Sequence, residues 1–262
     1  MQLVTLITDW GSKDFFAGMV KGRLHTFIPE CHVVDITHDI KPFSIPDAVF
    51  VAKAACGLFP ENTIHIIDVN SYESKTESHI VIKNNGHYFI CTDNGIPYGI
   101  FGETFDEAYM IDVRQDSNFY TFASLDIFSK VAGMIFNKVP LNKIGAPLQE
   151  LNFSQLRNDT YTKNTLNASV MYTDAYGNAY LNLTYERFEE MRNSRRFSVR
   201  LTFSKNIGVH KISTSYDDVP PDGHALLTVS ATGLMQIAIN RGSAEKLLGL
   251  RVDEVVTFEF ED

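Results

Sequence analysis

The stretch Leu3-Val4-Thr5-Leu6-Ile7-Thr8-Asp9-Trp10-Gly11 decides the fold of this chain. Apolar and β-branched residues run without a charge as far as Asp9, a pattern typical of a strand that is buried on both faces. The carboxylate of Asp9 follows at the carboxyl end of this strand. Ligands of open α/β sheets bind just outside the carboxyl ends of the strands, so Asp9 is well placed to meet one. An equally good interpretation is that Asp9 caps the helix that follows.

Strand, helix and strand alternate around this stretch, which predicts a largely parallel sheet with right-handed crossovers. Asn84-Asn85-Gly86, between two apolar runs, predicts a β-hairpin. Asp14 is the expected cap of the first helix. The further elements expected in this part of the chain are helices over 15–27, 46–57 and 126–137 and strands over 33–36, 63–69, 79–83 and 88–91.

The composition changes after Pro147, where a stretch rich in Asn, Gln, Thr and Ser begins. We therefore expect an N-terminal α/β domain over 1–148, a linker over 149–167 and a C-terminal β domain over 168–262. The predicted fold class is α/β, with a mixed, largely parallel sheet domain followed by a smaller β-barrel-like domain. The second domain is expected to hold strands over 168–172, 179–183, 197–203, 225–230, 235–239 and 255–260, and short helices over 187–192 and 244–248.

Composition and charge exclude several classes of function. The 262 residues carry a formal net charge of −9, which argues against nucleic acid or an anionic membrane as the main partner. The sequence has no apolar run long enough for a membrane span. Its start, Met1-Gln2-Leu3-Val4, lacks a basic region and a cleavage site, so no signal peptide is expected. Three scattered cysteines, Cys31, Cys56 and Cys91, fit reduced thiols in a cytoplasmic protein. Neither these cysteines nor the eight histidines form a zinc pattern, so no metal is expected.

Polar residues recur where strands are expected to end: Asp9, the loop that leads to Phe43, the run Asp68–Ser71, and Asp93-Asn94. Groups at the ends of several strands of one sheet can together hydrogen-bond a polyhydroxylated ligand. In the second domain, Thr173–Asn178 is a tight turn between two strands. Asp, Gly and Asn are ordinary turn formers, so no single one of these segments identifies a site.

Taken together and in order, these segments resemble the motifs of one family. The motifs are Leu6–Asp14, Val34–Phe43, Thr92-Asp93-Asn94-Gly95, Thr173–Asn178 and the late run Gly233–Ala244. They are similar to those of the S-adenosylmethionine hydroxide adenosyltransferases and of their halogenating relatives, the fluorinase and chlorinase. The resemblance covers nearly the whole chain.

The resemblance implies a homotrimer whose ligand lies between the N-terminal domain of one subunit and the C-terminal domain of its neighbour. Asp9 matches the carboxylate that holds both ribose hydroxyls, a task suited to two acceptor oxygens. The other implied substrate contacts are Phe43 against the ribose, Asn94 in its strand-end motif, Asp174 and Asn178 at the methionine end, and Tyr176 and Tyr216 against adenine.

The implied reaction is attack of a small nucleophile on the ribose carbon that is bonded to the sulfonium, with methionine as the leaving group. The family's hydrolases supply an Asp, an Arg seven residues later, and a His in a Thr-Phe-His-Gly-Arg-Asp run. In this chain the Asp is Asp68, the Arg position holds Lys75 and the His position holds Ala123. Lys75 keeps a positive charge without the planar fork of Arg, and Ala123 offers no hydrogen bond. Asp68 and Lys75 are the expected catalytic residues.

Other departures leave alternatives open. Ser71 and Ser124 match hydroxyls that contact the halide in the fluorinase, and His79 is a substitute for the missing imidazole or a surface residue. Ala231, Thr232 and Ile239 replace polar residues of the family, which leaves adenosine or a trimmed analogue as a possible ligand.

The expected function is hydrolysis of S-adenosylmethionine to adenosine and L-methionine by water, slowed by the changes at Lys75 and Ala123. S-adenosylmethionine is then a substrate, and no cofactor is expected. The alternatives are a non-catalytic trimer that binds an adenosyl ligand as a sensor or sink, and an enzyme that uses a halide.

Overall fold

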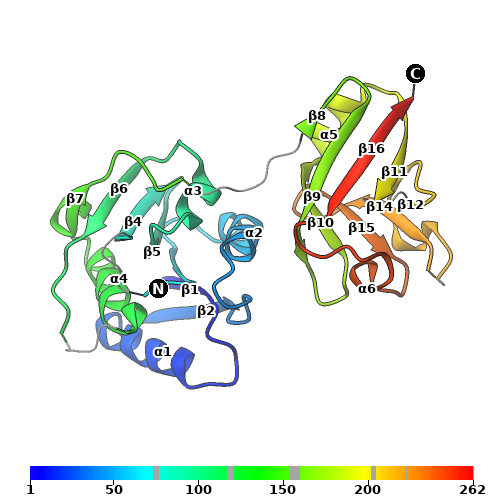
Figure 1. The fold of residues 1–262 in the computed structure, drawn as a ribbon. Helices are drawn as coiled ribbons and strands as arrows, with labels where there is room; N and C mark the ends of the chain where they lie inside the picture. The colour runs from blue at the N-terminus through cyan, green and yellow to red at the C-terminus, as the bar shows by residue number, and fades with distance from the viewer. Residues whose placement is uncertain (73–76, 117–120, 154–159, 202–204, 222, 262) are drawn as a thin grey trace. The chain divides into compact units, whose positions relative to one another are not determined.

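The computed structural model describes residues 1–72, 77–116, 121–153, 160–201, 205–221 and 223–261. The chain divides into two compact units, Met1–Gln155 and Leu156–Asp262, which are described separately here (Figure 1). No helix in the described part of the chain is long and apolar enough to cross a membrane. Within the same residues, no group of three or more His, Cys, Asp or Glu side chains could hold a metal ion.

The N-terminal unit is a doubly wound α/β sheet with the strand order β2-β1-β3-β5-β4-β6-β7. The first four of these strands are parallel to one another. Strands β4, β6 and β7 continue the sheet, and each is antiparallel to the strand before it in this order. Helices α1 and α4 pack together, and α2 packs with α3 (Figure 1). The strands are β1 (Gln2–Thr8), β2 (Cys31–Thr37), β3 (Ile64–Asp68), β4 (His79–Asn84), β5 (His87–Thr92), β6 (Glu107–Ile111) and β7 (Gly145–Pro147). The α-helices are α1 (Phe16–Phe27), α2 (Ile45–Ala55), α3 (Ile96–Phe101) and α4 (Ser129–Phe136).

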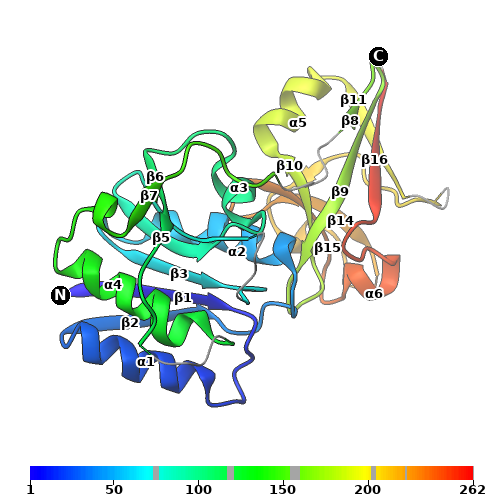
Figure 2. The same cartoon turned by 60° about the vertical axis from the view of Figure 1, so that its left-hand side comes forward.

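The prediction that the first strand is buried on both faces is confirmed. Val4 to Thr8 of β1 are all fully buried between β2 and β3. Val4 and Leu6 belong to the core that also holds Val20 of α1 and Val131 of α4. Strands β1 and β3 run in the same direction, and Thr8 pairs with Asp68, so the carboxyl ends of these two strands lie next to each other (Figure 2).

The hairpin between β4 and β5 is also confirmed. Asn85 and Gly86 both have positive φ, 49° and 77°, as a two-residue primed turn requires. The predicted cap of the first helix is wrong, because Phe15 occupies the cap position of α1 and no side chain there accepts a hydrogen bond. The last helix of this unit starts later than expected as an α-helix, since a π-helical turn, Ser124–Phe128, precedes α4.

The C-terminal unit is a single curled sheet that forms a half-barrel, with the order β12-β11-β16-β9-β10-β15-β14-β13 and with β8 paired to β9. The rings of Phe188, Phe197 and Phe258 pack edge to face in its core. The segment expected to be a linker over 149–167 includes β8 and the start of β9. The strands are β8 (Thr160–Tyr161), β9 (Thr165–Thr173), β10 (Ala179–Thr184), β11 (Arg196–Leu201), β12 (Lys205–Asn206), β13 (Ile212–Ser213), β14 (Ala225–Val229), β15 (Leu234–Ile239) and β16 (Val255–Glu261), and the helices are α5 (Tyr185–Arg192) and α6 (Ala244–Leu248).

Candidate functional site

Asp9 lies directly after β1, and main-chain groups from two other loops hold its carboxylate. The backbone N–H of Phe43 donates to Asp9 Oδ2 at 2.9 Å, and that of Asn70 donates to the same oxygen at 3.4 Å. Both donors come from loops that follow β2 and β3, so the interpretation of Asp9 as the cap of α1 is wrong. Both hydrogen bonds that Asp9 forms with described residues use Oδ2, which leaves Oδ1 to accept hydrogen bonds from a ligand.

The two donors share an uncommon backbone conformation. Phe43 has φ 65° and Asn70 has φ 52°, in the left-handed region that side chains other than glycine rarely adopt. Non-glycine residues in this region are concentrated at functional sites, where the surrounding structure holds them in place. The Phe43 side chain is 69% exposed, so the loop presents an aromatic ring to solvent while its main chain holds Asp9.

Asp68 is the last residue of β3, and its carboxyl group is buried. The pKa of Asp68 is raised to about 7, chiefly by burial and in smaller part by the negative charge of nearby Asp9, while Ser124 and Ser71 oppose the shift. Asp68 Oδ2 and the Ser124 hydroxyl are both buried, and neither forms a hydrogen bond of ordinary geometry with a described residue, although Ser124 lies close enough to lower the pKa of Asp68. Buried polar atoms are nearly always paired, so these two atoms are suited to pair with each other or with a small polar guest.

The π-helical turn places Ser124 at this position. A π turn inserts one extra residue into a helix and is frequent at functional sites. The Ser129 hydroxyl donates to the Ser124 carbonyl oxygen at 2.6 Å and secures the turn. Ala123, at the position of the family histidine, is half-buried just before Ser124. Lys75, the second expected catalytic residue, lies outside the described residues.

His79, the candidate substitute for the missing imidazole, forms its contacts within the N-terminal unit. Its Nδ1 lies 2.9 Å from the Thr92 hydroxyl, its cross-strand partner, and its ring packs edge-on against Phe128. Burial lowers the pKa of His79 to about 4. The residue therefore joins β4 to β5 as a half-buried histidine that is neutral at neutral pH.

Two aromatic residues near Asp9 were not singled out from the sequence. Trp10 stacks on His38 with ring centroids 5.7 Å apart, and its edge meets Phe122 at 5.0 Å. His38 Nδ1 is 2.8 Å from the hydroxyl of Thr8 in β1. The stack packs beside the carboxyl end of β1. Trp10 is the only tryptophan of the chain, which was the one signal in the sequence that could have drawn attention to it.

The expected residues of the C-terminal unit form a separate cluster around the turn between β9 and β10. Asp174 Oδ1 accepts hydrogen bonds from the backbone N–H groups of Tyr176 and Asn178, each at 3.0 Å. Asp174 Oδ2 accepts from Asn178 Nδ2 at 2.9 Å and from the Tyr180 hydroxyl at 3.2 Å. Asp174 thus shapes its own turn, as the Asp-Gly-Asn composition predicts. Gly177 has φ 79°, and a Cβ there would collide with Ser243 Oγ.

The aromatic residues of this cluster differ in their surroundings. The Tyr216 hydroxyl donates to Gln236 Oε1 at 3.0 Å, whereas Tyr176 is 81% exposed. Burial, followed by the negative charge of Asp174, raises the pKa of Tyr180 to about 12. The same two causes raise the pKa of Tyr216. Tyr180 and Gln236 are additions to the expected set, and they pair across β10 and β15.

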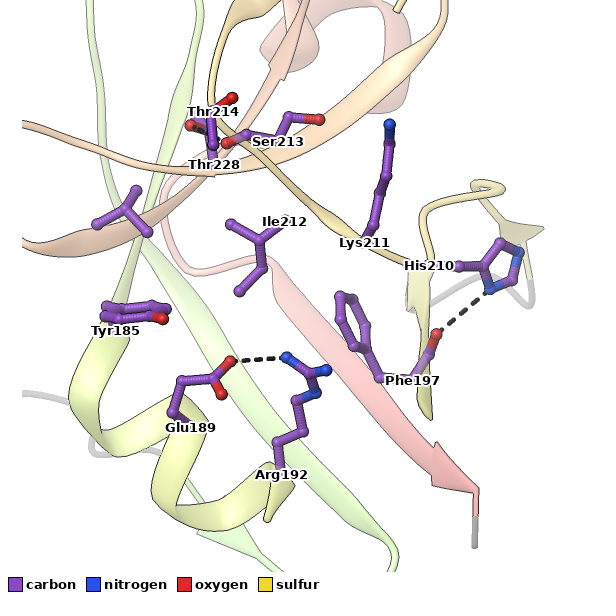
Figure 3. Close-up of a pocket in the computed structure, with 11 residues that line it drawn as sticks. Tyr185, Glu189, Arg192, Phe197, His210, Lys211, Ile212, Ser213, Thr214 and Thr228 are labelled. Atoms are coloured by element: carbon purple, nitrogen blue, oxygen red, sulfur yellow. Dashed lines mark hydrogen bonds and ion pairs between the residues drawn. The ribbon is translucent and has the colours of Figure 1, made fainter. Parts of the chain in front are cut away.

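Two larger cavities lie away from the expected residues. One, of about 640 Å³, lies between α5, β11 and β13 in the C-terminal unit (Figure 3). Its charged groups are largely satisfied by one another, because Arg192 Nη1 donates to Glu189 at 2.8 Å, and His210 lies 3.3 Å from the Phe197 carbonyl oxygen. The other, of about 610 Å³, is lined by Gln2 and Tyr88 near the amino end of the N-terminal sheet. Neither contains an expected site residue.

Comparisons with known proteins identify relatives along nearly the whole chain. A protein named (R)-S-adenosyl-L-methionine hydrolase from Methanocaldococcus jannaschii is 24% identical, over 97% of this chain and 95% of its own length. A protein named fluorinase from Nocardia brasiliensis is 19% identical, over 92% of this chain and 91% of its own. The crystal structure of an uncharacterized conserved protein from Thermotoga maritima superposes with a TM-score of 0.89 at 25% identity, covering 98% of this chain and 99% of that one.

Family models match both halves of the chain. The model of the SAM hydroxide adenosyltransferase N-terminal domain matches residues 4–145, which include Asp9, Asp68 and Ser124. The model of the corresponding C-terminal domain matches residues 168–257, which include Asp174 and Tyr216. With both domains matched in order, the chain belongs to the SAM hydroxide adenosyltransferase family.

Proposed function

We propose that this protein hydrolyses S-adenosyl-L-methionine to adenosine and L-methionine. The observation that carries the proposal is the juxtaposition of two carboxyl groups at the carboxyl edge of the N-terminal sheet. Asp9 is oriented by main-chain N–H groups with one oxygen left available, and Asp68 is buried beside it with a raised pKa. The names of the relatives, which are (R)-S-adenosyl-L-methionine hydrolases for the most part, support the same reaction.

In this proposal Asp9 binds the ribose. A carboxylate oxygen can accept hydrogen bonds from both hydroxyls of a vicinal diol, and charged acceptors form the stronger hydrogen bonds. The hydrogen bonds from Phe43 and Asn70 fix Oδ2, so Oδ1 faces the ligand in a constant direction. Phe43, exposed and adjacent, then lies against the sugar. Positioning of this kind contributes to catalysis because it removes orientational freedom before the reaction begins.

Asp68 and Ser124 hold the attacking water. A water between Asp68 Oδ2 and Ser124 Oγ would pair both of these buried atoms, with Ser71 close to the same carboxylate. The water oxygen forms a bond to the ribose 5′ carbon while the bond from this carbon to sulfur breaks. The electron pair of the broken bond stays on sulfur, so methionine leaves as a neutral thioether, and the water's proton passes to Asp68. A carboxyl group with a pKa of about 7 is well matched to accept that proton near neutral pH.

The C-terminal cluster would receive the rest of the substrate. Asp174 and Asn178 contribute the polar groups for the methionine end, and Tyr176 and Tyr216 the rings for adenine. All four hydrogen bonds of the Asp174 carboxylate with described residues lie within its own turn or with Tyr180. Its contribution is therefore a fixed negative charge facing the substrate's ammonium group, more than a new hydrogen bond.

A homotrimer would bring the two half-sites together. Exposed Phe43 in one unit and exposed Tyr176 in the other are aromatic surfaces that a partner subunit would cover. Light scattering on the purified protein tests this, since a stable monomer that still binds adenosine would contradict it. The three free, buried cysteines support a reducing compartment such as the cytoplasm.

The reaction is tested by incubating the protein with S-adenosyl-L-methionine and separating the products by chromatography. Release of adenosine and methionine in equal amounts, slowed about 10²–10⁴-fold in Asp68→Asn, is the expected result. Unchanged substrate together with measurable adenosine binding would replace the proposal with a binding protein, which the alanine at position 123 favours. A 5′-halogenated adenosine formed in the presence of chloride or fluoride would instead identify a halide-using enzyme, which Ser71 and Ser124 favour.

A further inference from the structure

Asn94 follows β5 in the turn before α3, and its side chain reaches across to the loop after β3. Asn94 Nδ2 donates to the carbonyl oxygens of Val69 at 3.0 Å and Asn70 at 3.1 Å. Asn94 Oδ1 accepts from the backbone N–H of Ile96 at 3.3 Å. Two carbonyl acceptors and one N–H donor fix the orientation of the amide, because only its nitrogen can donate. Both N–H bonds of the amide are thereby used within the protein.

One of these contacts is linked to Asp9 through a single peptide unit. The carbonyl oxygen of Val69 accepts from Asn94, and the N–H of the same peptide, that of Asn70, donates to Asp9 Oδ2. A trans peptide is planar, and its C=O and N–H point in opposite directions, so the two hydrogen bonds lie on opposite sides of one rigid plate. Fixing the carbonyl therefore fixes the direction in which the N–H points.

The second contact secures the conformation that this arrangement needs. Asn70 has φ 52°, and Asn94 holds the carbonyl on each side of its α-carbon. Residues in the left-handed region persist where neighbouring groups determine the backbone. Without the Asn94 amide, the Val69–Asn70 peptide is free to rotate, and Asp9 loses one of its two main-chain donors.

We propose that Asn94 is a positioning residue that acts through the Val69–Asn70 peptide on Asp9 and does not contact substrate. The inference rests on the proposed role of Asp9 in binding the ribose diol. It changes the role expected for Asn94 from a direct substrate contact to control of the ribose-binding carboxylate.

The test is a double-mutant cycle on adenosine affinity, measured by calorimetry with Asp9→Asn, Asn94→Ala and the combined variant. Asn94→Ala should weaken binding about tenfold, an effect typical of groups that orient a ligand's direct partner. The combined variant should bind only slightly more weakly than Asp9→Asn, because residues that act through one another are non-additive. Asn142→Ala, at an exposed asparagine of the same unit, is the matched control and should bind normally. Thermal melting verifies that each variant is folded.

A second ligand separates positioning from a general loss of structure. The loss of affinity caused by Asn94→Ala should be smaller for 2′-deoxyadenosine than for adenosine, because 2′-deoxyadenosine lacks one of the hydroxyls that Asp9 would hold. Asn94→Asp keeps the acceptor for Ile96 but turns a carboxylate oxygen toward the two carbonyl oxygens, so it should weaken binding at least as much as Asn94→Ala. Fully additive penalties, or equal penalties with both ligands, would overturn the positioning role. If Asp9→Asn itself binds adenosine normally, the proposed ribose contact is wrong instead.

Discussion

Asp9 and Asp68 stand at the carboxyl ends of adjacent parallel strands, and the negative charge of Asp9 raises the pKa of Asp68. Burial is the larger cause of the shift to about 7, and the neighbouring carboxylate is a smaller one. Asp9, held by main-chain N–H groups, is suited to bind hydroxyls, and Asp68 is suited to accept a proton.

Asp9→Asn should move the acid limb of the pH profile of kcat/KM to lower pH. Removing the negative charge removes one cause of the raised pKa of Asp68, while the contribution of burial remains. The profile of kcat/KM reports the ionisation of the free enzyme. Asp14→Asn, which removes an exposed carboxylate, is the control and should leave the limb in place. If the acid limb lies at the same pH in Asp9→Asn and in the natural protein, the charge of Asp9 does not raise the pKa of Asp68.

Relative to the natural protein, Asp68→Asn should stabilise the fold more at pH 8 than at pH 5. The same substitution should slow adenosine release about 10²–10⁴-fold. A raised pKa means that the folded state binds more protons than the unfolded state between the ordinary value of 3.8 and about 7. Ionisation of Asp68 therefore costs stability as the pH rises through that window, and the cost is complete above it. Asparagine does not ionise, so the difference in unfolding free energy between variant and natural protein should grow with pH in urea titrations.

Ala123→His combined with Lys75→Arg should raise the rate of adenosine release. Histidine would restore a hydrogen-bonding group next to Ser124, and arginine a planar pair of donors, whereas each single change should do less because such residues act as a unit. Restored acid–base groups typically contribute about 10²–10⁴-fold, so partial recovery is measurable. An inert double variant that still binds adenosine would show that the site uses a different nucleophile or serves only to bind its ligand.

Acid should destabilise the N-terminal unit through His65. This fully buried ring lies 2.7 Å from the Thr5 hydroxyl and 3.1 Å from His87, and burial, followed by His87, lowers the pKa of His65 to about 3. The unfolded state then binds more protons between about pH 6.5 and 3, so stability is complete above pH 6.5 and falls by up to about 1.4 kcal/mol per pH unit below it. His65→Asn should reduce this slope in urea titrations, and His32→Asn, at an exposed position of β2, should leave it unchanged. Equal slopes in all three proteins would refute the assignment.

Much of the fold was predictable because local chemistry and tertiary structure agree. The uninterrupted apolar run of β1 predicts its burial on both faces, and Asn85-Gly86 predicts the hairpin that the positive φ values require. Strand β6 was not predicted, since Glu107–Ile111 has no clear alternation and is paired by β4 and β7 from distant parts of the chain. The π turn at Ser124 was likewise invisible, because its apolar spacing resembles that of an α-helix.

The sequence could predict where the candidate residues lie in the fold, but not which groups they contact. Asp9 and Asp68 could be placed at strand ends from the pattern alone. That Asp9 is held by the main chain of Phe43 and Asn70 could not be foreseen, since backbone donors leave no signature in residue identity. The same limit applies to Asn94, whose amide contacts two carbonyl groups about 25 residues earlier in the chain.

The way in which Asp9 is held bears on how this family diversifies. Its two donors are main-chain groups, so the side chains of the loops that supply them can change in evolution without releasing the carboxylate, provided the backbone tolerates positive φ. Asn70 stands in such a loop, and Ser71 follows it directly. Side chains such as that of Ser71 can therefore be replaced while both main-chain donors to Asp9 stay in place. The orientation of the Asp9 carboxylate is in this way independent of the side chains that surround it.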